Sequence, residues 1–228
     1  MSSTIFMGLV IVFAVALVLA GIYLVGQLFK NLPPSKGRLN QDLDKMRTEL
    51  QPWVDKLVPW NREEMELFSL NQINQTIKKS VATTAKGMFT SIYHEPMMAY
   101  AYKKYVSPNL NAILLVRSKK HEFVYRFKKD KIQIMADGEP LGTLKEDGVL
   151  YGTQRGKVLG QIGQNRDKLL LPVVVKEREI AHLTNPKLNT QPNPRAFDLL
   201  SENMTEEEET IFLALGSLEV VSASLNKK

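Results

Sequence analysis

Residues 5–29 form an almost unbroken apolar run, interrupted only by Gln27, and no charged side chain precedes Lys30. At 1.5 Å per residue, a helix over this run is about 36 Å long, enough to cross ~30 Å of hydrocarbon with some tilt. A lone strand in lipid leaves its backbone groups without hydrogen-bond partners, so the segment must be helical there. The sequence therefore predicts a transmembrane helix at residues 5–29, after a short leader at residues 1–4.

Two other interpretations of this run are weaker. A cleaved signal peptide has a basic leader, an apolar core of about 7–15 residues and a small-residue cleavage site. Here the leader has no Lys or Arg, the run is longer, and basic residues follow it directly. A buried core helix of a soluble domain is also disfavoured, because this run carries no polar face over a length that suits a membrane span.

The charges that flank the run predict its orientation. Basic residues on the cytoplasmic side of a membrane helix set its topology. They follow the run closely and do not precede it: Lys30, Lys36, Arg38, Lys45 and Arg47. We therefore expect a single-pass protein with its N-terminus outside and its main domain in the cytoplasm. The absence of cysteine excludes disulfides and fits a reducing compartment.

Residues 30–65 form a hinge and an amphipathic linker. Pro33 and Pro34 end the membrane helix, and apolar residues then recur at spacings of four and three. One interpretation is an oligomer seam that pairs two chains through Leu39, Leu43, Met46 and Leu50. The other is a single helix that packs on its own domain or on the bilayer. We favour the second, because Pro52 interrupts the pattern. Trp53 and Trp60 suit either the membrane interface or packing into the domain.

From about residue 66 to 183 the apolar period changes to two, as in Phe123, Tyr125 and Phe127. Turn signals such as Asp137-Gly138 separate the apolar segments. The pattern predicts a meander of short antiparallel strands, folded as a barrel or sandwich. The expected strands lie near 66–70, 76–83, 87–94, 97–105, 112–117, 122–128, 131–136, 140–144, 148–152, 157–162, 168–175 and 179–183.

A helix is expected near the C-terminus, at residues 206–224. Thr205 and Glu208 have the spacing of a capping box, and acidic residues suit the positive end of a helix. Residues 211–221 are apolar nearly all round, which is typical of a helix buried on every side. The soluble domain, residues 66–228, is thus predicted to be mainly β with a buried C-terminal helix that runs through a barrel.

Two segments repeat a local pattern, residues 138–144 and 156–162, each with a turn glycine and a glycine within the strand. A glycine inside a strand indicates a bend or the close approach of another element. With the helix at 206–221, these segments resemble the superfamily of the tubby C-terminal domain, LURP-one proteins and phospholipid scramblases, over about residues 66–222. The resemblance implies a barrel closed around a helix. No binding residue of that superfamily has a matching motif here, and scramblases carry their hydrophobic helix at the other end.

Segments that resemble motifs of enzymes or cofactor sites depart from those motifs at required positions. The segment 152–157 lacks the length and the Ser or Thr of a phosphate loop, and no Ser lies in a nucleophile elbow. His94, His121 and His182 do not have metal-ligand spacing. We therefore expect no cofactor, no metal and no enzymatic activity. Carboxylates brought together only by folding remain an alternative.

Basic residues supply the strongest functional signal. They cluster after Arg117, with Lys103 and Lys104 upstream, and the candidate lipid-contact residues are Lys119, Lys120, Arg126, Lys128, Lys129 and Lys131. Such a surface on a tethered domain can contact anionic lipid headgroups of the bilayer. The alternative is a solvated strand edge, where lysine prevents aggregation. We expect no nucleic acid as a partner, because the domain is tethered to a membrane and lacks a recognised binding motif.

Together these features predict a membrane-anchored, non-enzymatic binding or scaffolding protein. The alternative is a structural assembly component, either a homo-oligomer formed through the juxtamembrane helix or a complex with another protein. A third hypothesis is an enzyme whose site is assembled only by folding.

Overall fold

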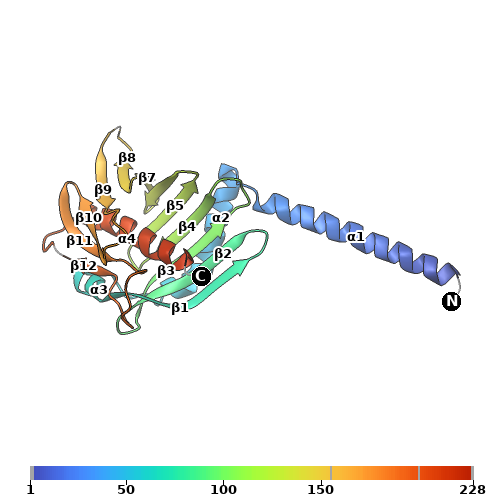
Figure 1. Cartoon of the computed structure of the whole chain (residues 1–228), viewed down its shortest axis with the longest axis horizontal. Helices are drawn as coiled ribbons and strands as arrows, with labels where there is room; N and C mark the ends of the chain where they lie inside the picture. Colours follow the sequence, from blue (N-terminus) through green and yellow to red (C-terminus); the bar gives the residue numbers. More distant parts are fainter. Residues whose placement is uncertain (1–2, 155, 200, 227–228) are drawn as a thin grey trace.

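The computed structural model of the chain describes residues 3–154, 156–199 and 201–226. Helix α1 (Ser3–Asn31) projects away from the remainder of the molecule, as Figure 1 shows. The side chains of residues 7–25 are all exposed, so the helix contributes nothing to the core of the domain. One helix, at Met7–Asn31, is long and apolar enough to cross a membrane.

Helix α2 (Lys36–Val54) packs along the outside of the barrel with its apolar side. Leu43, Met46 and Leu50 are buried there against Ala101 and Ile113 of the sheet. Of the two interpretations of this segment, packing on its own domain is therefore the one that the structure shows. Pro52 lies within the last turn and does not end the helix.

The domain is a sheet of twelve antiparallel strands that pair in sequence order and curl into a nearly closed barrel. This confirms the predicted fold class. Short helix α3 (Arg62–Leu67) precedes the first strand. The strands are β1 (Phe68–Lys79), β2 (Thr83–Ser91), β3 (Pro96–Lys104), β4 (Asn111–Arg117), β5 (Glu122–Lys128), β6 (Lys131–Ala136), β7 (Glu139–Lys145), β8 (Val149–Gly152), β9 (Val158–Ile162), β10 (Leu170–Val175), β11 (Arg178–Thr184) and β12 (Phe197–Leu199).

The barrel closes where the chain before β12 meets the start of β1. The amide of Leu70 donates to the Pro194 carbonyl at 3.0 Å, and the amide of Ala196 donates to the Phe68 carbonyl at 2.7 Å. The side-chain amide of Asn71 adds a hydrogen bond to Oδ1 of Asn193 at 2.6 Å. The outer edge of β1 beyond Leu70 therefore stays without a neighbouring strand.

Helix α4 (Glu206–Asn226), red in Figure 1, lies inside the curved sheet. Its residues 211–215 are fully buried in the same core as the inward-facing side chains of the strands. The predicted capping box is confirmed. The Glu208 amide donates to Oγ1 of Thr205 at 3.2 Å, and the Thr205 amide donates to Oε2 of Glu208 at 2.9 Å.

Two strand glycines make the close approaches that their position indicates. A Cβ on Gly160 would lie 2.8 Å from the Val174 carbonyl oxygen and 3.3 Å from side-chain carbons of Ile211 and Leu215 on α4. A Cβ on Gly142 would lie 2.3 Å from the carbonyl oxygen of Tyr151 on the neighbouring strand. Both glycines therefore let the sheet curve tightly around the helix.

The beginning and the end of the strand series differ from the prediction. The predicted strands at 66–70 and 76–83 are one long strand, β1, which a bulge interrupts where Asn74 adopts a positive φ of 55°. The strand expected at 87–94 begins at Thr83. The prediction missed β12, because three residues after a proline-rich segment carry too little alternation to detect.

The tryptophans belong to the domain. Trp60 is buried and donates its indole N–H to the Met97 carbonyl at 2.7 Å. Trp53 packs against the α2 cluster, with the Lys86 ammonium 5.5 Å from its ring centre. Packing, and not a membrane interface, therefore accounts for both side chains.

Candidate functional site

Strand β5 carries two of the six predicted basic residues, Arg126 and Lys128. Its aromatic residues Phe123 and Tyr125 point into the barrel, whereas Val124 packs outside against α2. Because side chains alternate along a strand, Arg126 and Lys128 lie on the outer face with Val124. The predicted separation of aromatic and basic faces on this strand is thus present.

The structure divides the six candidate lipid-contact residues into three groups. Lys119 and Lys120 lie in the turn before β5, and Lys128, Lys129 and Lys131 lie at the turn after it. Strand β5 spans Glu122–Lys128, so these two turns are about 20 Å apart. Arg126 lies between them, on the outer face of the strand. The six residues therefore do not form one compact cluster.

The lysines before β5 are already engaged. Lys119 donates to the carbonyl of Asp55, at the C-terminal end of α2, at 2.9 Å. A cation at this position suits the negative end of the helix. The Lys120 ammonium pairs with the Glu206 carboxylate of α4 at 3.0 Å. Both side chains thus link helices to the barrel at the end of β5 opposite to Lys128.

The opposite end of the barrel carries lysines at the ends of β1, β3, β5 and β6. Lys79 and Lys104 both pair with Thr83 in the ladder, so they lie at the same end of the sheet. Lys128 pairs with Asn111 on one side and with Lys131 on the other. We call this set the basic rim, and it comprises Lys36, Lys79, Lys104, Lys128, Lys129 and Lys131.

Helix α1 ends beside the basic rim. The carbonyl of Asn31, its last residue, accepts a hydrogen bond from the Val106 amide in the β3–β4 turn at 2.7 Å. The guanidinium of Arg38 donates to the Phe29 carbonyl at 2.9 Å. In Figure 1, α1 leaves the domain near α2 and β4 and points away from it. The apolar helix therefore joins the domain at the end of the barrel that carries the rim.

The charges of the rim are not neutralised within the domain. Among the described residues, no ion pair includes any of its six lysines, whereas neighbouring Lys103 is held by Asp42 at 2.9 Å. Partial burial lowers the pKa of Lys128, and the positive charges of Arg126 and Lys131 lower it further. This mutual repulsion favours a bound anion. Asp130, in the β5–β6 turn, is the acidic residue within this stretch.

Sequence reasoning missed Lys79 as part of this surface and used Lys36 only for the orientation of the membrane helix. Both are far from residues 119–131 along the chain, and only the barrel brings them together. A detectable signal was present, because Lys79 ends a strand next to a hairpin turn. Lysine at successive hairpin ends of a sequentially ordered sheet predicts a charged rim.

The predicted oligomer seam is covered by the domain itself. On the inner side of α2, Leu43, Met46 and Leu50 are buried against the sheet, and Leu39 packs at the edge of the same cluster. A dimer through this seam would require α2 to leave the sheet. Dimerisation by this route therefore carries a large cost in buried apolar area.

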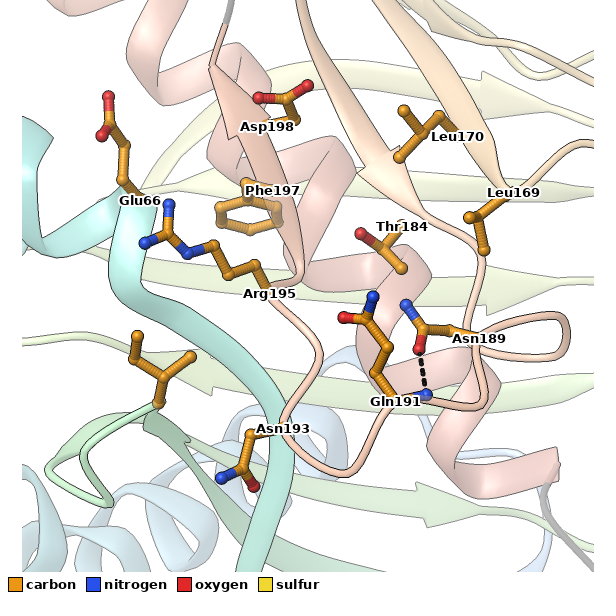
Figure 2. A pocket seen from close by; sticks show the side chains of 11 residues that line it. Glu66, Leu169, Leu170, Thr184, Asn189, Gln191, Asn193, Arg195, Phe197 and Asp198 are labelled. Atoms are coloured by element: carbon orange, nitrogen blue, oxygen red, sulfur yellow. Dashed lines mark hydrogen bonds between the residues drawn. The ribbon is translucent and has the colours of Figure 1, made fainter.

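A pocket of about 780 Å³ lies on the side of the barrel away from α1, next to α3 and β12. Figure 2 shows Glu66 and Arg195 on its α3 side, with Leu169 and Leu170 opposite. The rest of the polar lining is three amide side chains, a hydroxyl and a carboxylate, those of Asn189, Gln191, Asn193, Thr184 and Asp198. The pocket mixes charge, amides and exposed leucines, which suits a soluble molecule of mixed polarity.

Comparisons of this chain with protein-family models, curated proteins and solved structures find no match. Functional conclusions therefore depend on the geometry of the molecule.

Proposed function

We propose that this protein is a single-pass, membrane-anchored, non-enzymatic binding protein whose barrel contacts anionic lipid headgroups through the basic rim. One observation carries the proposal: lysines outside the ion pairs of the described residues lie at strand ends on the side of the barrel that the apolar helix α1 joins. A helix that spans the bilayer places that end of the barrel next to the headgroups. Each rim lysine near an anionic surface contributes on the order of 1 kcal/mol, over a Debye length of about 10 Å at 0.1 M salt.

The same proposal places the domain in the cytoplasm. Lys30, Lys36 and Arg38 follow the helix directly, and cytoplasmic leaflets carry the anionic lipids. The rim and the positive-inside rule thus agree on one orientation. Lys119 and Lys120 face away from the bilayer in this arrangement and serve to hold α2 and α4.

Vesicle binding by residues 33–228 tests the headgroup contact. This fragment keeps every buried apolar residue of the core, since the first of these is Leu43. The variant Lys129→Gln/Lys131→Gln removes two exposed charges from the rim. Its matched control, Lys119→Gln/Lys120→Gln, removes two charges from the opposite end of β5.

We expect the fragment to co-sediment with vesicles that contain phosphatidylserine, less so at high salt, and not with phosphatidylcholine alone. The rim variant should bind about tenfold more weakly or worse, from roughly 1 kcal/mol per lysine. The control variant should bind as the unmodified fragment does. Equal loss in both variants would mean that only net charge matters, and the rim would lose its role.

Labelling tests the orientation, and the absence of cysteine makes the experiment simple. Single-cysteine variants Ser3→Cys and Lys187→Cys of the full chain are exposed to a membrane-impermeant maleimide in intact cells. The proposal requires labelling of the first variant, and labelling of the second only after lysis. The reverse pattern would place the domain outside.

A further inference from the structure

A groove of about 570 Å³ runs along the outer face of the barrel, between α2 and strands β5–β8. One wall is α2, which contributes Leu39 and Leu43, and the floor includes Val124 and Met135. The end nearer to α1 is formed by the first turn of α2 and by Arg126. The groove has the size of a small-molecule site, and its lining is mostly apolar with four charged side chains, those of Asp44, Arg47, Glu122 and Arg126.

Arg126 is a half-buried cation without a counter-ion. Its Nε is buried and has no hydrogen-bond partner, and no carboxylate pairs with it among the described residues. Its neighbours across the sheet are Ile113 and Gln133. Arg47, which lines the same groove, is held by Glu122 at 2.7 Å and by Asp44 at 2.8 Å. Burial of an unpaired charge is costly, so Arg126 favours an anion in the groove.

The groove offers little backbone for a peptide to pair with. Strands β5, β6 and β7 are each bonded to a neighbour on both sides, so their amides and carbonyls are used within the sheet. The other wall is a helix, whose backbone bonds are internal. An extended peptide docks by pairing with a free strand edge, which is absent from this floor. An acyl chain has no such requirement.

We propose that this groove binds a long-chain carboxylate, a fatty acid, with its carboxylate on Arg126 and its chain against Leu39, Leu43, Val124 and Met135. The planar guanidinium matches a carboxylate and binds it with two parallel hydrogen bonds. Arg126 lines the groove together with the first turns of α2, which begins five residues after α1 ends, so a bilayer crossed by α1 supplies such amphiphiles at this end. The site does not depend on headgroup binding by the rim, which uses other side chains.

Binding of palmitate to residues 33–228 tests this site, with displacement of a fluorescent fatty acid as the readout. Hexadecanol, which has the same chain and no charge, is the matched ligand control. We expect saturable binding of one palmitate per chain and much weaker binding of hexadecanol. Arg126→Gln should weaken palmitate binding at least tenfold, whereas Lys129→Gln, a rim cation outside the groove, should leave it unchanged.

A second variant covers the case in which Arg126→Gln fails to fold. Met135 is 37% exposed, so Met135→Glu is compatible with the fold and places a negative charge against the chain. This variant should lose palmitate binding while its unfolding transition is retained. The proposal is overturned if unmodified protein does not bind palmitate, if hexadecanol binds equally well, or if folded variants bind as the unmodified protein does. Loss of vesicle binding in the rim variant leaves these outcomes unaffected.

Discussion

The phenolic oxygen of Tyr125, on the barrel wall, lies 2.7 Å from Oγ of Ser217, on the helix that the barrel encloses. The tyrosine hydroxyl is also 2.8 Å from the Ala214 carbonyl oxygen, and the Ser217 hydroxyl is 2.6 Å from the Leu213 carbonyl oxygen, so the two hydroxyl protons serve three contacts. Both side chains are fully buried. This polar contact fixes α4 at one height and rotation within an otherwise apolar interior, which non-directional packing alone does not specify.

Replacement of Tyr125 by Phe removes this contact and keeps the ring. We expect the free energy of unfolding of residues 33–228 to fall by about 1–3 kcal/mol, because a buried carbonyl and a buried hydroxyl lose a partner. Urea denaturation measures this change. Tyr93→Phe is the control, because Tyr93 is 69% exposed and its loss should have little effect. An equal effect in both variants would deny the contact any special role.

The buried tyrosines also predict a loss of stability at alkaline pH. Burial raises the pKa of Tyr125, and burial together with the hydrogen bond to Asp42 raises that of Tyr105. Because the pKa is higher in the folded state, these tyrosines lose their protons at a lower pH in the unfolded chain than in the folded one. The contribution of each tyrosine to the free energy of unfolding is therefore fully present below its unfolded pKa of about 10. Above that pH, each tyrosine lowers the free energy of unfolding by about 1.4 kcal/mol per pH unit. Unfolding midpoints between pH 8 and 11 (roughly the range over which tyrosine ionises) should decline less steeply in Tyr125→Phe than in the unmodified fragment.

Much of the fold was predictable because it depends on local pattern. The alternation around Tyr125 and the turn at Asp137-Gly138 locate β5 to β7 within a residue or two. The all-round apolar helix preceded by Thr205 and Glu208 indicates a buried α4. Strand β12 was not predictable, because it exists only where the barrel closes. Resemblance to the tubby and scramblase superfamily stays a prediction.

The candidate site was predictable only in part. Charge density along the chain identified Lys128, Lys129 and Lys131, but it joined them to Lys119 and Lys120, which a strand of seven residues separates. The pairing register of the strands decides which end of the barrel each lysine occupies. Spacing along the sequence does not reveal this register. The isolation of Arg126 likewise depends on which carboxylates the fold brings near it.

Asp42 links α2 to the barrel through two partners on β3 and the turn that follows. Its carboxylate accepts from the Lys103 ammonium at 2.9 Å and from the Tyr105 hydroxyl at 2.8 Å. Asp42→Asn should lower the free energy of unfolding by about 3 kcal/mol, because it leaves a half-buried ammonium unpaired. It should also raise hydrogen exchange along α2. Asp44→Asn, at a side chain that is 70% exposed, should cost less than about 1 kcal/mol.

Gly160 lies where the sheet packs directly against α4, and its substitution predicts an effect on stability opposite to that of Gly37. A methyl group there meets the Val174 carbonyl oxygen at 2.8 Å and the side chains of Ile211 and Leu215 at 3.3 Å. Gly160→Ala should therefore destabilise the domain by about 1–3 kcal/mol, since a packed interior resists added volume. Gly37→Ala, in the first turn of α2 with nothing within 4 Å of the new methyl, should stabilise it by up to about 1 kcal/mol. Urea denaturation of both variants measures the two signs, and a neutral Gly160→Ala would mean that the barrel and helix can separate without strain.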